Sequence, residues 1–283
     1  MTNHSRLGSL AVLLGIALTP CGCVNVDVGL ANLMSADRAP RTAVLARGYA
    51  VQDLIIHRGD RLIGITHAHN DQSRAVIVFC GGDSFHRSIE GGEALETLAR
   101  NADVVLFDYP GYGESTGSPT ATVILENALA VYDYAVALET SAGKKRLLYG
   151  FSLGGMVAAQ IASRRPVDGL VLEATAPSAE AWARSQIPWY AKPLVKPRIE
   201  PGLASIDGLV ALRHFGGDVL LLTSPSDRRV PAALSVHMYR ELRRMGVRTD
   251  LVQFHGADHG GIPHTPEYGS VLTAFLDRVK GPQ

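Results

Sequence analysis

Short runs of apolar residues recur along most of this chain and alternate with longer amphipathic stretches. Residues 75–80 are apolar throughout, which is typical of a strand that helices cover on both faces. Similar runs follow at Val104–Phe107, Leu147–Tyr149, Gly169–Leu172, Val219–Leu222 and Leu251–Phe254. Apolar residues recur at helical spacing in Ala121–Leu138, Ser152–Ser163, Ala232–Met245 and Pro266–Lys280. This alternation predicts an α/β fold, with a mostly parallel central sheet and helices on both faces.

Two segments depart from that alternation. Leu54–Ile56 and Leu62–Ile65 flank the turn residues 58–60, which predicts an antiparallel hairpin ahead of the parallel strands. Residues 176–215 are too long for an ordinary connection, and we expect them to form a small cap of short helices. The aromatic residues of this cap either line a pocket beneath it or pack it onto the core: Trp182, Trp189 and Tyr190.

The N-terminal residues have a different character from the rest. A polar start precedes the apolar run Leu7–Leu18, which is short for a membrane span and fits an export signal over residues 1–23. Cys21 and Cys23 follow this run, as does the lipid-bearing Cys of bacterial lipoproteins, whereas an uncleaved membrane anchor is the alternative. We therefore predict an exported protein of the cell envelope or periplasm, with a possible lipid anchor to the membrane. A linker over 24–48 would then precede a domain over 49–283.

Length and charge exclude several classes of protein. A chain of 283 residues with 46% hydrophobic residues suits one globular domain with a sizeable core. Lys and Arg together number 27, as do Asp and Glu, so the net charge indicates no nucleic-acid partner. The sequence carries no indication of oligomeric state.

One glycine-rich segment, residues 150–155 (GFSLGG), lies between a predicted strand and a predicted helix. In that context the pattern G-x-S-x-G forms a nucleophile elbow, in which a strained turn exposes the hydroxyl of Ser152. The alternative is a glycine-rich turn with a helix-capping serine. Serine is a weak nucleophile by itself, so the rest of the chain has to supply a base.

His259 is the best-placed base, because its glycine-containing loop directly follows the last predicted strand. His255 and His264 are weaker candidates. Asp227 lies in the loop after the preceding strand, which completes the chain order Ser, Asp, His. An oxyanion would be held by the amide of Leu153 and, from the loop after residues 75–80, by the amide of Gly82.

Four segments together resemble the α/β-hydrolase superfamily over nearly everything from about residue 50 onwards. Besides the elbow, residues 108–119 (DYPGYGESTGSP) look like a loop of an esterase-like subgroup with the pattern D-Y-x-G-Y-G-x-S-x-G-x-P. Residues 227–231 look like that family's acid loop and residues 257–260 like its histidine loop. Relatives usually carry His-Gly where this chain has Cys80-Gly81. The resemblance implies a serine hydrolase acting on a carboxylic ester or a related small-molecule acyl substrate, without a cofactor.

Several rival functions remain open. The same machinery serves peptidases and thioesterases, and the same fold serves binding proteins without activity. His67, His69 and Asp71 resemble the H-x-H-x-D ligand cluster of metal-dependent hydrolases. However, position 72 is Gln rather than the further His of that pattern, so we predict no metal site there.

Overall fold

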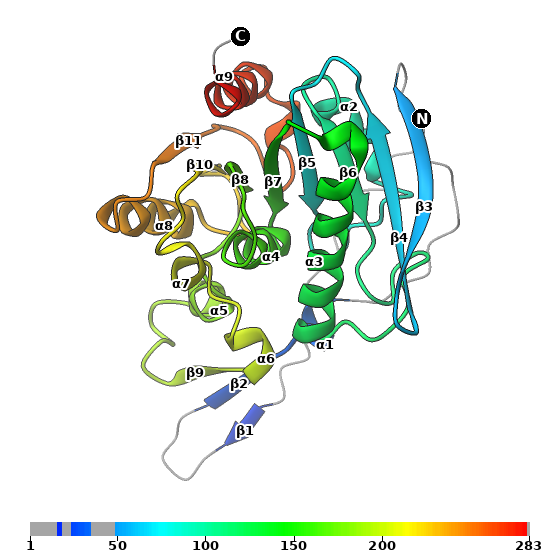
Figure 1. The fold of residues 1–283 in the computed structure, drawn as a ribbon. Coiled ribbons are helices and arrows are strands. Elements are labelled where there is room, and N and C mark those ends of the chain that lie inside the picture. The colour runs from blue at the N-terminus through cyan, green and yellow to red at the C-terminus, as the bar shows by residue number, and fades with distance from the viewer. Residues whose placement is uncertain (1–15, 19–23, 35–48, 282–283) are drawn as a thin grey trace, which may run out of the picture.

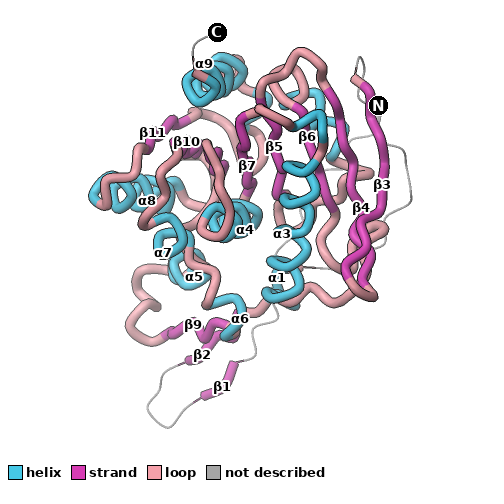
Figure 2. Tube along the Cα trace, in the orientation of Figure 1, coloured by secondary structure: helices cyan, strands magenta, loops and turns pink. Residues whose placement is uncertain are grey.

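The computed structural model describes residues 16–18, 24–34 and 49–281. Within these residues the main sheet has eight strands in the order β11-β10-β8-β7-β5-β6-β4-β3 (Figures 1 and 2). The sheet confirms the predicted mostly parallel architecture. Its strands are β3 (Ala50–Arg58), β4 (Arg61–His69), β5 (Ala75–Cys80), β6 (Asp103–Phe107), β7 (Lys145–Phe151), β8 (Gly169–Glu173), β10 (Asp218–Thr223) and β11 (Thr249–Gln253).

The hairpin and the parallel strands are arranged as the sequence predicts. β3 and β4 pair antiparallel around Gly59, whose φ of +62° suits a tight turn. β4 also pairs antiparallel with β6, and the remaining neighbours in the sheet are parallel. Every residue of β5, β6, β8 and β10 is buried, which explains the apolar runs.

Helices cover both faces of the sheet (Figure 1). One apolar core joins a sheet face to α3 (Ala121–Ala137), α4 (Leu153–Ala162) and α8 (Ala232–Arg244). A second core joins the other face to α2 (Gly91–Leu98) and α9 (Tyr268–Lys280). Short 3-10 turns lie at η1 (Glu139–Ser141) and η2 (Ile262–His264). The sequence analysis missed α2, which is a short helix that begins with two glycines.

Residues 176–215 contain α5 (Ala179–Gln186), β9 (Val195–Ile199), α6 (Pro201–Ala204) and α7 (Gly208–Leu212). The two ends of this cap lie side by side, because the amide of Gly208 donates to the carbonyl of Pro177 at 2.7 Å. Besides the short helices that we expect, the cap therefore contains a strand.

That strand pairs with residues of the expected linker. β2 (Val24–Val28) lies parallel to β9 and antiparallel to β1 (Ile16–Leu18), and α1 (Leu30–Leu33) follows β2. Residues 24–34 are thus ordered structure against the cap, in contrast to the expected linker. The remainder of that linker and most of the expected export signal, including Cys21 and Cys23, lie outside the described residues. No helix in the described ranges is long and apolar enough to cross a membrane.

Candidate active site

Ser152 occupies a strained turn between β7 and α4. Its φ is 54° and its ψ is −118°, a conformation that residues with side chains rarely adopt. Two contacts hold the turn: the Ser152 amide donates to the carbonyl of Glu173 at 2.9 Å, and the Thr175 hydroxyl donates to the Ser152 carbonyl at 2.6 Å. The end of the neighbouring strand β8 and the residues just after it therefore hold Ser152 in this conformation.

Two glycines make room for this turn. A Cβ atom on Gly154 would lie 2.0 Å from the carbonyl oxygen of Cys80. A Cβ atom on Gly150 would lie 2.5 Å from the carbonyl oxygen of Gly154. Neither contact is possible, so the glycines of the G-x-S-x-G pattern are a steric requirement of this site.

The structure brings the three predicted side chains together. His259 Nε2 lies 3.1 Å from Ser152 Oγ, and His259 Nδ1 lies 2.8 Å from Asp227 Oδ2. The side chains of His259 and Asp227 are only 8% and 1% exposed. Both distances are within hydrogen-bonding range, so an uninterrupted chain of hydrogen bonds joins hydroxyl, imidazole and carboxylate.

The backbone after Asp227 fixes the direction of its carboxylate. The amides of Arg229 and Val230 donate to Asp227 Oδ1 at 2.8 Å and 2.9 Å. The other oxygen, Oδ2, is left for His259. An aspartate bound in this way holds the imidazole with its Nδ1 proton toward the carboxylate and its Nε2 lone pair toward the serine.

The two predicted oxyanion donors lie beside Ser152. A Cβ atom on Gly82 would lie 3.7 Å from Cβ of Ser152 and 3.1 Å from the ring of Phe151. Leu153 is the first residue of α4. Neither the Gly82 nor the Leu153 amide donates to an acceptor within the described chain. Both are therefore available to a group bound near the serine hydroxyl.

Tyrosines of the segment 108–119 support the Gly82 loop. The Tyr109 hydroxyl donates to the carbonyl of Gly81 at 2.9 Å, and the Tyr112 hydroxyl donates to the carbonyl of Asp83 at 2.8 Å. These bonds lie on either side of Gly82. Two tyrosines of the D-Y-P-G-Y-G segment thus hold the loop that contains Gly82.

Arg87 also holds the segment 108–119, through its bonds to Asp108. The sequence analysis did not identify this role of Arg87. Its Nε donates to Asp108 Oδ2 at 3.0 Å, and its backbone amide donates to Oδ1 at 2.9 Å. Burial raises the pKa of the Asp108 carboxyl, while the hydrogen bonds and charge of Arg87 act in the opposite direction. A buried charge pair of this kind needs both partners, so removing Arg87 would loosen both loops.

A cavity of about 270 Å³ borders the site, and Gly82 and His259 are among the residues that line it. Most of its lining is apolar or aromatic, which suits an apolar part of a ligand. The lining comes from α2, the start of α9, the ends of β5, β7 and β8, and the loops that carry Gly82, Arg229 and His259, and it includes no residue of 176–215. This cavity therefore does not lie beneath the cap, whereas Trp182 of the cap packs against the first apolar core, which is the other role that the sequence left open. Phe79, Phe85, Phe151, Tyr149 and Tyr268 are its aromatic residues.

A buried carboxyl also lines this cavity, and the sequence analysis did not identify it. Glu173 ends β8, is 2% exposed, and accepts a hydrogen bond from the Tyr149 hydroxyl, which in turn lies 3.0 Å from that of Tyr268. Its second oxygen has no partner in the described chain. Burial raises the pKa of Glu173 to about 7, against the hydrogen bond from Tyr149 and with help from the negative charge of Asp227. Glu173 thus holds a proton to a much higher pH than an exposed glutamate.

This pKa predicts that Glu173 destabilises the fold as pH rises. The unfolded glutamate loses its proton near 4.5 and the folded one near 7, so unfolding releases a proton between these values. We expect Glu173→Gln to gain stability relative to wild type as pH rises through this window, by at most about 3 kcal/mol. Chemical unfolding at several pH values measures the difference. The control, Glu139→Gln at an exposed site, should track wild type, and parallel curves for wild type and Glu173→Gln would contradict the shift.

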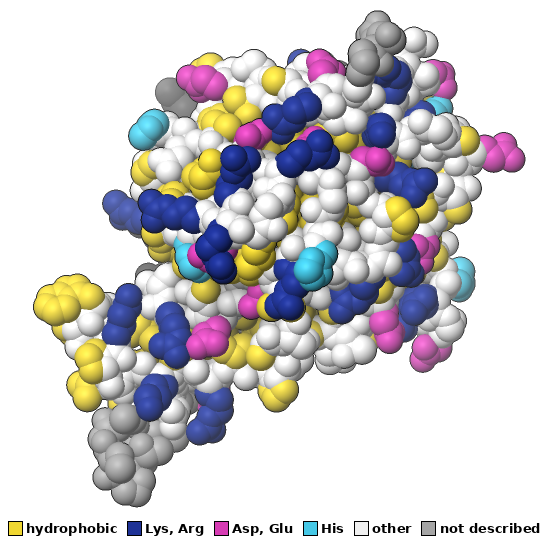
Figure 3. Space-filling view, turned by 60° about the vertical axis from the view of Figure 1, so that its left-hand side comes forward, with side chains coloured by type: hydrophobic (Ala, Val, Ile, Leu, Met, Phe, Trp, Pro, Cys, Tyr) yellow, Lys and Arg dark blue, Asp and Glu magenta, His cyan; other side chains and the backbone are white. Residues whose placement is uncertain are grey.

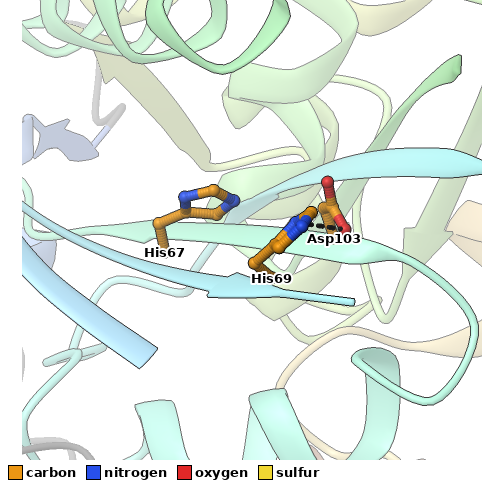
Figure 4. Close-up of side chains that lie close together, drawn as sticks. All are labelled: His67, His69 and Asp103. Atoms are coloured by element: carbon orange, nitrogen blue, oxygen red, sulfur yellow. Dashed lines mark ion pairs between the residues drawn. The ribbon is translucent and has the colours of Figure 1, made fainter. Parts of the chain in front are cut away.

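A separate cluster of side chains lies at the end of the sheet away from Ser152, where β4 ends and β6 begins. His67 and His69 from β4 meet Asp103 from β6, with one possible ligand atom from each within 4.8 Å of the others (Figure 4). Asp103 already accepts bonds from Lys144 Nζ at 2.8 Å and Ser73 Oγ at 3.0 Å. Asp71 pairs with His69 at 2.7 Å instead of joining the cluster. The Lys144 ammonium already binds the Asp103 carboxylate, which a metal ion would need as a ligand. These residues therefore fit an ion pair better than a metal site.

Comparison with known proteins shows the family to which this chain belongs. A family model described as the alpha/beta hydrolase fold matches residues 76–195. The protein Rv2307c of Mycobacterium tuberculosis, named as uncharacterized, is 30% identical over 250 residues, which cover 83% of this chain and 86% of that protein. The chain belongs to the α/β-hydrolase superfamily.

Relatives with named activities are more distant. The lysophosphatidylserine lipase ABHD12 of Mus musculus is 28% identical over 232 residues, which cover 73% of this chain but 56% of that protein. Among solved structures, the esterase Pf2001 of Pyrococcus furiosus has a TM-score of 0.67 at 18% identity and covers 88% of this chain and 98% of its own. An acylaminoacyl peptidase of Pyrococcus horikoshii has a TM-score of 0.66 at 15% identity, over 84% of this chain and 43% of its own. At these identities the solved structures show the shared fold.

Proposed function

We propose that this protein is a serine hydrolase that cleaves carboxylic esters through an acyl-enzyme on Ser152. The observation that carries the proposal is the hydrogen-bonded chain from Ser152 through His259 to Asp227, with links of 3.1 Å and 2.8 Å. This arrangement, with a nucleophile, a base and a carboxylate that orients the base, is the one that acyl transfer requires.

In the first step, His259 Nε2 takes the proton of Ser152 Oγ as that oxygen attacks the carbonyl carbon of the ester. The negative charge then grows on the former carbonyl oxygen, which the amides of Leu153 and Gly82 bind. The positive end of α4 adds to that stabilisation because the helix begins at Leu153. Asp227 stabilises the imidazolium that forms on His259.

In the second step, the His259 imidazolium gives its proton to the leaving alcohol as the bond between carbon and alkoxy oxygen breaks. Water then enters, His259 removes its proton, and attack on the acyl group restores Ser152 and releases the acid. No cofactor is needed for either step.

An ester is favoured over the other acyl substrates by the setting of the site. The cavity beside His259 has a largely apolar lining, which suits the acyl or alcohol part of an uncharged ester. Esterases and a lysophospholipid lipase are among the proteins that this chain resembles, although an acylaminoacyl peptidase is among them too. Peptide and thioester substrates, and a binding protein without activity, are the alternatives.

A fluorophosphonate probe tests whether Ser152 is a nucleophile. We expect one phosphonyl group on the peptide that contains Ser152, detected by mass spectrometry, and no labelling of Ser152→Ala. Denatured wild-type protein is the control for chance reaction. Equal labelling of native wild type and variant would contradict the assignment of the nucleophile, and absence of labelling in both would favour the binding protein.

We also propose that residues 1–23 direct export and that Cys21 or Cys23 carries a lipid that anchors the protein in the cell envelope. The apolar run Leu7–Leu18 followed at once by cysteines supports this proposal. Mass spectrometry of the purified protein would show an acylated N-terminal cysteine if it is correct. A free N-terminus at Met1 would contradict it.

A further inference from the structure

Two aromatic side chains of the cap, Trp189 and Tyr190, contact each other and are otherwise largely exposed to solvent. Trp189 is 80% exposed and Tyr190 is 68% exposed, the highest values for large hydrophobic side chains in the described chain. Leu194, five residues after Trp189, is 58% exposed. We call residues 188–196 the cap tip. Neither Trp189 nor Tyr190 lines the cavity or packs the cap onto the core, the two alternatives that the sequence offered for the cap aromatics.

Backbone hydrogen bonds fix the cap tip in its shape. The amides of Ala191 and Leu194 donate to the carbonyls of Pro188 and Ala191, each at 2.9 Å. The rings of Trp189 and Tyr190 meet edge to face with centroids 5.9 Å apart. The aromatic surface is therefore presented by a structured turn. An exposed apolar surface of this kind marks a place of contact with something outside the chain.

The charges around the aromatic residues indicate what that contact is. The cap tip contains Lys192 and Lys196 and no acidic residue. Neither lysine forms an ion pair with a described residue, and both are exposed. Figure 3 shows hydrophobic side chains at the edge of the lower lobe with Lys and Arg side chains beside them. Trp and Tyr with flanking Lys are typical of the boundary between lipid headgroups and acyl chains, whereas lysine is depleted in protein interfaces.

The course of the chain gives a second, independent argument. The amide of Val24 donates to the carbonyl of Leu194 at 2.8 Å, and β2 continues from there along β9. Val24, the first residue of β2, thus contacts the cap tip, and Figure 1 shows β2 beside β9. Cys21 and Cys23, on which we propose a lipid, precede Val24 by three residues and by one residue in the sequence, so a lipid there would be attached close in sequence to a residue that contacts the cap tip.

From these observations we propose that the cap tip is a membrane-docking surface, in which Trp189, Tyr190 and Leu194 enter the headgroup region of a bilayer while Lys192 and Lys196 bind anionic lipids. Insertion would bury apolar side chains that are now in water, and the two lysines would be attracted by the surface charge. The surface does not depend on the proposed hydrolase activity, since none of these residues lies in the site around Ser152.

Tryptophan fluorescence can test the depth of the cap tip, because the chain has only two tryptophans. The other, Trp182, is partly buried, and its indole N–H donates to the carbonyl of Arg229 at 3.0 Å. The full chain is reconstituted into vesicles of phosphatidylcholine and phosphatidylglycerol, with phosphatidylcholine brominated near the top of its acyl chains as quencher. We expect wild type to lose emission in brominated vesicles and Trp189→Phe, which reports Trp182 alone, to keep it.

The charge requirement is tested with a second variant. Lys192→Gln combined with Lys196→Gln should lower the docking equilibrium constant about 30-fold on anionic vesicles, at roughly 1 kcal/mol for each cation, and not on phosphatidylcholine alone. Ile55→Ser is the matched control, because Ile55 is 44% exposed on β3, at the far edge of the sheet. Thermal unfolding checks that the variants fold.

Two results would overturn the proposal. One is equal quenching of wild type and Trp189→Phe, or none in either, which would place Trp189 in water. The other is a dimer of wild type that Leu194→Ser converts to a monomer, with Trp189 unquenched in vesicles, which would make the cap tip an interface between two copies of the chain.

Discussion

Ser152→Ala should lower the rate of ester hydrolysis by about 10⁴- to 10⁶-fold, with little change in KM. The substitution removes one oxygen and leaves the rest of the site in place. The backbone bonds that hold residue 152, from its amide to Glu173 and from Thr175 to its carbonyl, do not involve the hydroxyl. The amides of Leu153 and Gly82 stay available, so the variant should keep a small residual rate above that of water.

Hydrolysis of a p-nitrophenyl ester of short chain length measures this effect. The matched control is Ser163→Ala, because Ser163 lies at the other end of α4, where its hydroxyl donates to the carbonyl of Gln160 at 2.9 Å and accepts from Arg164 Nη1 at 3.2 Å, far from the candidate site. That variant should hydrolyse the ester at the wild-type rate. If Ser152→Ala retained activity within tenfold of wild type and unfolded at the same temperature, the hydroxyl would not be the nucleophile.

The proximity of the candidate catalytic residues could be predicted from chain order. Ser152, Asp227 and His259 each follow a strand of a parallel sheet, and the carboxyl ends of parallel strands meet at one edge. The glycines around Ser152 indicated the elbow for a steric reason that the structure bears out. The distances, and the bonds that aim Asp227 at His259, depend on loop conformations that no local pattern specifies.

Other features of the site depend on contacts between distant segments. Glu173 looks like a polar residue at the end of a buried strand, and its high pKa arises from burial that only the folded chain creates. The pairing of β2 with β9 joins residues about 170 positions apart, so the sequence of either strand alone could not predict it. The cavity was expected beneath the cap because that segment is rich in aromatic residues, but α2, which was not predicted, supplies one of its walls.

Asp227→Asn should lower the rate of ester hydrolysis by about 10⁴-fold without displacing the side chain. The reason lies in the backbone bonds to Asp227 Oδ1, which the amides of Arg229 and Val230 donate at 2.8 Å and 2.9 Å. Only the oxygen of an asparagine amide can accept these bonds. The NH2 group of Asn is therefore forced into the position of Oδ2, which lies 2.8 Å from His259 Nδ1.

An NH2 group in that position donates to Nδ1, so the single proton of the neutral imidazole must move to Nε2. Nε2 faces Ser152 Oγ at 3.1 Å, and once protonated it cannot accept the serine proton. The variant also lacks the negative charge that stabilises the imidazolium. Asn is nearly isosteric with Asp, so a loss of this size would come from the tautomer and the charge rather than from packing.

Comparison with Asp227→Ala and Asp258→Asn separates this mechanism from a structural role. Asp258 is exposed and adjacent to His259 in sequence, so its amide variant should keep the wild-type rate. If Asp227 served only to fill space and accept backbone bonds, Asn would rescue most of the activity that Ala loses. We expect instead that Asn and Ala are similarly inactive near neutral pH, while thermal unfolding of Asp227→Asn stays close to wild type because its Oδ1 bonds persist. Activity of Asp227→Asn within tenfold of wild type would show that a different residue orients His259.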